Sequence, residues 1–519
     1  MRLHRILASS VVAALLLAAC SGTGDAESGS GGPGAGQSGS AVDALPEPVS
    51  LKDLGELTGV AQLEIGPNCT ATLIDTGVDD APAYLLTAGH CADGTRIPAQ
   101  AVTVDEPFEG TATFLNTFDN QDKLVVDAVQ LEYSTMRERD LAIVRLDSTL
   151  GELRDAGIRP IPIEQGVATE GTPVRNVAVP VQGLEQEDWV LRATNCTLGG
   201  RTDLIESGWL WFDQIRVDCA GVREGSSGSP LIALTADGEP AAVTSIINTT
   251  TVGGSEADAG FCSLGRPCEL SEDGKTKWVP DTSYAVPLDG LSECFADGVF
   301  ALGGACSLVV PPVWANQGGG PFRGGDLPDA TGTPPHVNLS ANPALGASQS
   351  VRTALRTLED PQVCQLPETY EGAETLSVPA TEGIWEEGLP VPVTLPEEEG
   401  FYAFCAVAGE DYQGAATVIF EVDRTPPAFD PVVEVEPTPD DPNTLTVLPV
   451  IDPPEIAIIR QAWVPGDGEC PAREDFQMSM GMLEFVEEND RPKTYCAYGL
   501  DSAGNESGIV RVFLPKDYN

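Results

Sequence analysis

The sequence predicts an all-β protein. Short apolar and β-branched runs, such as 70–74, 141–144 and 242–247, alternate with Gly, Pro, Asn and Asp through most of the chain. Many short strands separated by turn residues are typical of barrels and sandwiches. The 55 glycines and 42 prolines also favour turns over a helical bundle. At roughly 100–200 residues per domain, a chain of 519 residues is expected to contain about three domains.

The first twenty residues have the pattern of a targeting segment. Two arginines and a histidine precede the apolar run Ile6–Leu17. This run is too short to span a bilayer as a helix, which takes about 20 residues, and it suits the core of a signal peptide. It ends in Leu-Ala-Ala-Cys20, which resembles the lipobox of bacterial lipoproteins. The resemblance implies that residues 1–19 are removed and that Cys20 carries the lipid.

A Gly/Ser-rich stretch follows at 20–45. It has too few apolar residues to form a core, so we expect a flexible tether. No other stretch is long and apolar enough to predict a transmembrane helix. We therefore expect an exported protein held to a membrane of the bacterial cell envelope by its lipid, at the outer membrane, the periplasmic face or the cell surface.

The charge of the chain excludes one class of partner. With 79 acidic and 28 basic residues, the formal net charge is −51. A surface of this sign repels phosphate backbones, so we do not expect the protein to bind nucleic acid.

The cysteines predict disulfides. The chain has 13 cysteines, and an even number remains once Cys20 is set aside. Export into an oxidising compartment makes disulfides the expected state. Neighbouring positions suggest six pairs, although sequence alone leaves the connectivity open: Cys69 with Cys91, Cys196 with Cys219, Cys262 with Cys268, Cys294 with Cys306, Cys364 with Cys405, and Cys470 with Cys496.

Zinc is the alternative use for so many cysteines. Zinc sites usually contain closely spaced Cys-x-x-Cys pairs, often with histidines. The sequence has no such pair, and His90 is the only histidine that stands next to a cysteine. We therefore predict no metal and no cofactor.

The C-terminal part of the chain contains a repeat. Thr-Pro-Pro at 333–335 recurs at 425–427, and an aromatic-Cys-Ala motif at 404–406 recurs at 495–497. Each motif precedes a Gly/Asp turn and a closing β-type run. A repeat unit of about 90–95 residues with one internal disulfide has the size of an immunoglobulin-like sandwich.

This repeat predicts two Ig-like β-sandwich modules, at 333–424 and 425–519. A Pro/Gly-rich linker is expected before them at 311–332. The modules resemble the Ig-like or fibronectin-like modules of bacterial surface proteins, and that resemblance implies a surface ligand for them.

Three segments carry the residue types of nucleophilic catalysis. They are Leu-Leu-Thr-Ala-Gly-His90-Cys, Arg-Asp140-Leu-Ala-Ile-Val, and Gly225-Ser-Ser227-Gly-Ser-Pro. A serine hydroxyl is a weak nucleophile near pH 7 and needs an adjacent base. Imidazole suits that task because its pKa lies close to the working pH. A carboxylate that enters an apolar strand, as Asp140 does, needs a polar partner.

Together the three segments resemble the chymotrypsin-like (trypsin-fold) serine peptidases of bacteria in order and spacing. The resemblance covers about residues 50–305 and implies a double six-stranded β-barrel for the domain at 46–310. It also implies that Ser227 attacks a peptide substrate, that His90 is its general base, and that Asp140 orients the imidazole. The backbone N–H groups of Gly225 and Ser227 are then expected to form the oxyanion hole.

Two features of the sequence differ from animal members of that family. Ser226 stands where those enzymes carry the aspartate that pairs with a freed N-terminus, so we do not expect activation by that route. Gly221 stands where trypsins carry an acidic specificity residue, so a preference for Arg or Lys is not supported. We expect Gly221, together with Asn248, Thr249 and Thr250, to line the substrate cleft. No histidine lies in this strand, so a preference for Glu is not predicted either.

Two alternatives compete with a serine endopeptidase. The first is a surface lipoprotein with an inactive peptidase fold that serves in binding or adhesion; the presence of all three catalytic residue types argues against it. The second is a lipase or esterase of the α/β-hydrolase class. That class requires Gly-x-Ser-x-Gly with the histidine after the serine. The motif around Ser227 lacks the final glycine, and His90 precedes it.

Overall fold

The computed structural model describes residues 42–65, 68–93, 102–254, 262–318, 321–324, 332–381, 388–438, 441–450, 456–479 and 484–518. The predicted signal peptide at 1–19, the lipidation site Cys20 and most of the predicted tether lie outside these residues. Within the described part of the chain, no helix has both the length and the apolar character needed to cross a membrane.

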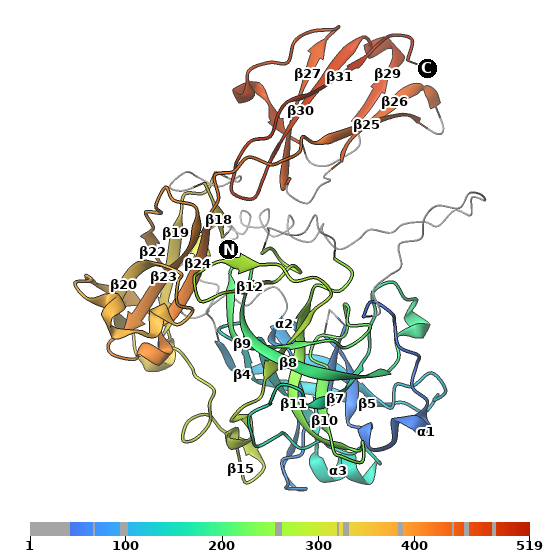
Figure 1. Ribbon diagram of the computed structural model, residues 1–519, viewed down its shortest axis with the longest axis vertical. Coiled ribbons are helices and arrows are strands. Elements are labelled where there is room, and N and C mark those ends of the chain that lie inside the picture. Colours follow the sequence, from blue (N-terminus) through green and yellow to red (C-terminus); the bar gives the residue numbers. More distant parts are fainter. Residues whose placement is uncertain are drawn as a thin grey trace, which may run out of the picture. The chain divides into compact units, whose positions relative to one another are not determined.

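The first six strands form a closed barrel in the order β1-β2-β3-β6-β5-β4. Two of them, β4 and β5, are labelled in Figure 1. Neighbouring strands are antiparallel throughout. Three short helices accompany the barrel: α1 (Leu51–Leu54), α2 (Gly89–Asp93) and α3 (Leu150–Asp155). The strands are β1 (Val60–Glu64), β2 (Asn68–Leu73), β3 (Pro82–Thr87), β4 (Val102–Phe114), β5 (Leu124–Thr135) and β6 (Leu141–Thr149).

A second sheet closes into a ring as well. Its strand order is β13-β12-β8-β7-β10-β11-β14-β9, and an additional pairing of β8 with β9 closes a ring of six strands. The strands are β7 (Pro173–Ala178), β8 (Arg192–Glu206), β9 (Trp209–Val217), β10 (Pro230–Leu234), β11 (Pro240–Thr250), β12 (Cys268–Leu270), β13 (Thr276–Lys277) and β14 (Ser283–Pro287). A small hairpin follows, formed by β15 (Phe295–Ala296) and β16 (Val299–Phe300). The prediction of an all-β chain that begins with a double six-stranded barrel is confirmed.

Strand β6 shows why its continuous apolar run is buried. Successive side chains of a strand point to opposite faces. Ala142 and Val144 lie in the core of the first barrel. Ile143 lies in a second cluster, which also contains Ile232 and Ile246 from the second barrel. Both faces of β6 are therefore covered, one by the barrel interior and the other by the neighbouring barrel.

The residues after 310 form two further pairs of sheets. The first module combines a three-stranded sheet, β17-β19-β22, with a five-stranded sheet, β18-β24-β23-β20-β21. Side chains from both sheets share one core. The strands are β17 (Val313–Gly318), β18 (Phe322–Arg323), β19 (His336–Ala341), β20 (Ser348–Thr357), β21 (Thr375–Pro379), β22 (Leu389–Pro392), β23 (Gly400–Ala408) and β24 (Ala416–Val422).

The second module repeats this plan with sheets β25-β26-β29 and β28-β27-β30-β31. They enclose a core of their own. The strands are β25 (Val432–Thr438), β26 (Asp441–Val450), β27 (Ile458–Pro465), β28 (Gln477–Met478), β29 (Glu484–Glu487), β30 (Lys493–Leu500) and β31 (Val510–Leu514). A two-sheet unit is what the repeat predicts; the Ig-like classification of both units stays a prediction.

Part of the segment that we expected to be a linker belongs to the first module. Strand β17 lies within residues 311–332 and pairs with β19 along its whole length. Strand β18 pairs in parallel with the end of β24. The Pro and Gly residues around these strands suggested a linker, because local composition does not reveal that Val313 and Ala315 fill the core of the module.

Strand β23 is buried on both faces, unlike a strand at the surface of an isolated sandwich. Tyr402 and Phe404 lie in the core between the two sheets of the module. Cys405 and Val407 point the other way, into a cluster that also contains residues of β8 and β9, among them Leu210. The outer face of the first module thus shares a hydrophobic core with the double barrel.

All six predicted disulfides are present. Two of them border the shared core just described, on either side of the boundary between barrel and module. The pairs are Cys69–Cys91, Cys196–Cys219, Cys262–Cys268, Cys294–Cys306, Cys364–Cys405 and Cys470–Cys496.

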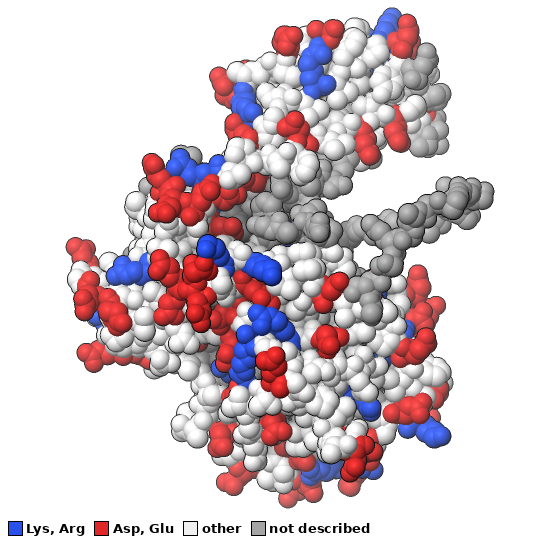
Figure 2. Space-filling model, viewed as in Figure 1, with Lys and Arg blue, Asp and Glu red and all other residues white. Residues whose placement is uncertain are grey.

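Acidic side chains outnumber basic ones over the face drawn in Figure 2, in agreement with the net charge of −51.

The shared core predicts that the double barrel and the first module unfold together. Leu210→Ala removes buried methyl groups from that core and should lower its stability by about 2–5 kcal/mol. We expect calorimetry to show one transition for the barrels with the first module and a separate one for the second module. Leu210→Ala should lower the midpoint temperature of the first transition only. The matched change Leu445→Ala, in the core of the second module, should lower the midpoint temperature of the second transition only. Separate melting of barrel and first module would contradict the shared core.

Candidate active site

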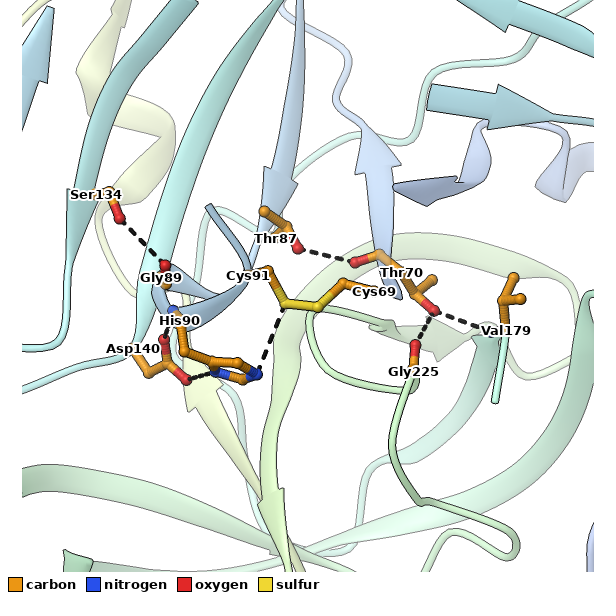
Figure 3. Close-up of a disulfide and its surroundings, with 10 residues drawn as sticks. All are labelled: Cys69, Thr70, Thr87, Gly89, His90, Cys91, Ser134, Asp140, Val179 and Gly225. Carbon is orange, nitrogen blue, oxygen red and sulfur yellow. Dashed lines mark hydrogen bonds and ion pairs between the residues drawn. A yellow bond between two sulfur atoms is a disulfide. The ribbon is translucent and has the colours of Figure 1, made fainter. Parts of the chain in front are cut away.

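His90 is held by a disulfide and by close packing of the backbone. It lies on α2, directly after β3, and the next residue, Cys91, is bonded to Cys69 on β2 (Figure 3). A side chain at Gly89 would collide with the carbonyl oxygen of Thr135 at the end of β5. Glycine at this position therefore lets the histidine segment pack directly against the strand that leads to Asp140.

Asp140 binds His90 through both of its carboxylate oxygens. Nδ1 of His90 lies 2.6 Å from Oδ2, and the backbone N–H of His90 donates to Oδ1 at 2.8 Å (Figure 3). Asp140 is fully buried, so these bonds supply the polar partner that its carboxylate needs. Because Nδ1 faces the carboxylate, the neutral ring carries its proton there and Nε2 is left as the basic nitrogen.

The surroundings of His90 raise its pKa above the ordinary value. Desolvation alone would lower the pKa, because it disfavours the charged imidazolium. The charge and hydrogen bond of Asp140, and then the charge of Glu206, outweigh that effect. The site therefore stabilises a proton on the imidazole more than water does.

Glu206 is a member of this site that the sequence analysis missed. It ends β8, is only 4% exposed, and accepts a hydrogen bond from the backbone of Gly265 at 2.8 Å. Burial raises the pKa of Glu206 to about 6, against the opposing effect of the hydrogen bond from Gly265. Nothing in the sequence marks this residue, because its proximity to His90 depends on how the second barrel meets the first.

Ser227 is brought to the same place through its backbone. Its carbonyl oxygen accepts a hydrogen bond from Thr70 N at 2.9 Å, and Thr70 follows the disulfide-bonded Cys69. The loop of Ser227 thereby rests on the strand that is tied to the His90 segment. Among the described residues the Ser227 hydroxyl has no hydrogen-bond partner, and Nε2 of His90 lies 3.7 Å from the sulfur of Cys91. A bond between the hydroxyl and Nε2 stays a prediction.

Gly225 adopts a conformation that only glycine accepts readily. Its φ is +90°, and a Cβ there would collide with the carbonyl of Val179. Its own carbonyl accepts a hydrogen bond from Thr70 Oγ1 at 2.8 Å (Figure 3). Within the described residues, neither Gly225 N–H nor Ser227 N–H donates to a protein acceptor. Both donors expected for the oxyanion hole are therefore available.

The residues expected to line the substrate cleft have different surroundings. Thr249 and Thr250, near the end of β11, are partly exposed, and Thr250 shares a hydrogen bond of 2.9 Å with the hydroxyl of Ser283. Asn248 is buried and donates to Gln214 at 3.3 Å. Only the two threonines therefore present side-chain surface to the outside.

Gly221 lies beneath the N-terminal segment of the described chain. Its N–H donates to the carbonyl of Val42 at 2.8 Å, and a Cβ at this position would collide with Pro46. Arg223, two residues on, donates to the carbonyl of Asp43 at 2.8 Å. This loop is thus packed against residues 42–46, which the sequence analysis assigned mostly to a flexible tether.

One cluster has the residue types of a metal site but cannot bind a metal ion in this form. Potential ligand atoms of Cys69, His90 and Cys91 lie within 4.8 Å of one another, and no other such cluster occurs among the described residues. Both sulfurs are joined in a disulfide, so neither can act as a thiolate ligand.

Part of the chain matches a known protein family. Residues 69–243 match the family described as Trypsin-like peptidase domain. The chain therefore contains a trypsin-like peptidase domain. The matched region includes His90, Asp140 and Ser227. No curated protein matches the chain.

The peptidase domain is similar to solved serine proteases at low sequence identity. A thermostable serine protease, AL20, from an extremophilic microorganism is 13% identical with a TM-score of 0.31, over 46% of this chain and 94% of that chain. The protease Anisep from Arthrobacter nicotinovorans is 12% identical with a TM-score of 0.28, over 44% and 90%. A Glu endopeptidase in complex with MPD is 16% identical with a TM-score of 0.30, over 41% and 90%.

Glu206→Gln tests the electrostatics of the peptidase domain. The glutamate charge raises the pKa of His90, so its removal should lower that pKa. Because Glu206 itself titrates near 6, its effect on His90 is complete only above that pH. NMR titration of the His90 imidazole measures the change. The exposed Glu272→Gln is the control. An unchanged His90 titration in Glu206→Gln would contradict the coupling.

Proposed function

We propose that this protein is a serine endopeptidase, with Ser227 as nucleophile, His90 as general base and acid, and Asp140 as the group that orients the imidazole. The observation that carries the proposal is the double contact of the buried Asp140 with the ring and the backbone of His90. Such a contact selects the tautomer whose Nε2 accepts a proton, which is what a serine hydroxyl requires in order to attack.

The expected reaction proceeds through an acyl-enzyme. As the Ser227 oxygen attacks the peptide carbonyl, its proton moves to Nε2 of His90, and the carbonyl oxygen becomes an oxyanion. The imidazolium then gives this proton to the leaving amine as the C–N bond breaks. Water repeats the sequence with His90 as base and releases the acid product. Asp140 stays ionised throughout and stabilises the imidazolium.

The available N–H groups of Gly225 and Ser227 are suited to stabilise the oxyanion. Each such donor contributes about 3–4 kcal/mol to the transition state of related reactions. They cost no rearrangement if they already point into one site, and the Thr70–Gly225 hydrogen bond supports that orientation. We expect Thr249 and Thr250 to line the substrate cleft, with Gly221 and Asn248 behind that surface. The modules are expected to bind a surface ligand.

A fluorophosphonate probe tests the nucleophile directly. The activated Ser227 oxygen should displace fluoride from phosphorus, so the full-length oxidised protein is labelled once and a peptide carrying Ser227 gains the probe mass. Ser227→Ala should not be labelled. Ser226→Ala, which removes the neighbouring buried hydroxyl, should still be labelled. Folded wild-type protein that stays unlabelled would contradict an active peptidase and favour an inactive binding protein.

We further propose that the enzyme is exported and held to the cell envelope through lipid on Cys20. The sequence of residues 1–20 supports this, and the six disulfides agree with an extracytoplasmic location.

Cys20→Ser tests the anchor. Removal of the thiol should abolish lipid attachment and move most of the protein from the membrane fraction to the soluble fraction. The variant should keep the same rate of fluorophosphonate labelling, because Cys20 is not part of the catalytic site. Metabolic labelling with a fatty-acid analogue followed by fractionation measures both steps. Wild-type protein without lipid would contradict the proposed anchor and leave the catalytic proposal intact.

A further inference from the structure

The segment directly before Asp140 has an unusual backbone. Residues 136–139 join β5 to Asp140, and Glu138 has a φ of +60°. A non-glycine residue keeps that conformation only where its surroundings hold it. The carbonyl of Glu138 accepts a hydrogen bond from Phe212 N at 2.9 Å, and the carbonyl of Met136 accepts one from Trp211 Nε1 at 3.0 Å. Strand β9 therefore holds one side of the segment.

The first module holds the other side. Arg137 is 4% exposed, and its guanidinium donates to the carbonyls of Gln413 and Ala415 at 2.8 and 2.9 Å. It also forms an ion pair with Glu138 at 2.5 Å. The same Glu138 carboxylate accepts a hydrogen bond of 3.0 Å from Gln365 Nε2. A buried guanidinium needs such partners, and most of those of Arg137 come from the module.

Apolar packing fixes the module beside this polar contact. Ile205 and Leu210 of the peptidase domain share a cluster with Cys364, Tyr370 and Ile419 of the module. These side chains keep water away from the Arg137 hydrogen bonds, which strengthens them.

In the second module, the corresponding outer face is covered by residues of the same module. Cys496, Tyr498 and Leu500 of β30 pack against Phe476 of the same module. The corresponding strand of the first module, β23, relies in part on the peptidase domain for cover. Although the two modules repeat one plan, the first is thus specialised to dock on the catalytic domain.

We propose that the peptidase needs the first module for full activity. In this proposal Arg137 is a positioning residue that fixes the Asp140 segment through its contacts with Gln413 and Ala415. The proposal rests on the proposed catalytic roles of His90 and Asp140. Few residues separate the module from His90. The module contacts Arg137 and Glu138, and Asp140, two residues after Glu138, binds His90. On the other side of the segment, Thr135 packs on Gly89. Loosening the module should loosen the carboxylate that orients the imidazole.

The test compares Arg137→Met with Arg491→Met in the full-length protein. Arg491 is a matched control, since it is 7% exposed and donates to a backbone carbonyl, that of Asn443 at 2.7 Å, within the second module. We expect Arg137→Met to lower kcat on a short peptide at least about tenfold with little change in KM, a part of the roughly 10⁴-fold loss that follows when the orienting carboxylate is replaced. Arg491→Met should keep the wild-type kcat.

A second measurement reports how well Asp140 is positioned at His90 instead of the rate of the reaction. In a Ser227→Ala background, NMR titration should show a lower pKa for His90 in Arg137→Met, because Asp140 no longer stabilises the imidazolium as well. A loss of overall stability alone would not move the pKa of His90 in the folded fraction.

The outcomes separate this inference from the proposed function. If folded Arg137→Met keeps both the wild-type kcat and the wild-type His90 titration, the positioning role is wrong. If Arg137→Met does not fold, Gln365→Ala, which removes only the bond to Glu138, decides by the same two measurements and should change both in the same direction to a smaller extent. If wild-type protein is not labelled by a fluorophosphonate, the proposed function fails, while the His90 titration still decides whether the module positions Asp140.

Discussion

The structure of the candidate site depends on one buried carboxylate. Asp140 has no exposed surface, and its oxygens are bound by the ring and the backbone of His90. A charge without water is tolerated only where such partners are in place. The disulfide that pins the His90 segment, the glycine that lets it approach β5, and the hydrogen bonds that hold residues 136–139 all serve to keep the two residues together. We expect that disturbing any of them would loosen the contact between Asp140 and His90.

The loop that carries Ser227 is held mainly through hydrogen bonds to its backbone carbonyls. Thr70 is the connecting residue: its N–H binds the Ser227 carbonyl, and its hydroxyl binds the Gly225 carbonyl. Because Thr70 follows Cys69, the loop of the second barrel is joined to the disulfide of the first. These two hydrogen bonds from Thr70 therefore hold the Gly225–Ser227 loop of the second barrel on the first.

The relation between the peptidase domain and the first module differs from what a repeat suggests. Repeated units of similar length are usually taken as separate domains with surfaces of their own. Here β23 packs on the double barrel, and β17 extends the module into the segment expected to be linker. Arg137 is part of this union, because its guanidinium donates to the Gln413 and Ala415 carbonyls of the module.

The sequence by itself determined the all-β class, because apolar runs and turn residues are local patterns. Neighbouring cysteines suggested the six disulfide pairs without fixing their connectivity. The double barrel and the three residues proposed for catalysis came from the resemblance of three short motifs to a known family. Tertiary structure alone decided the position of Glu206, the cover that residues 42–46 place over Gly221, and the docking of the first module on Arg137. Each of these joins residues far apart in the chain, and such contacts leave no local pattern, because they depend on the complementary shape and charge of surfaces that exist only after the barrels have formed.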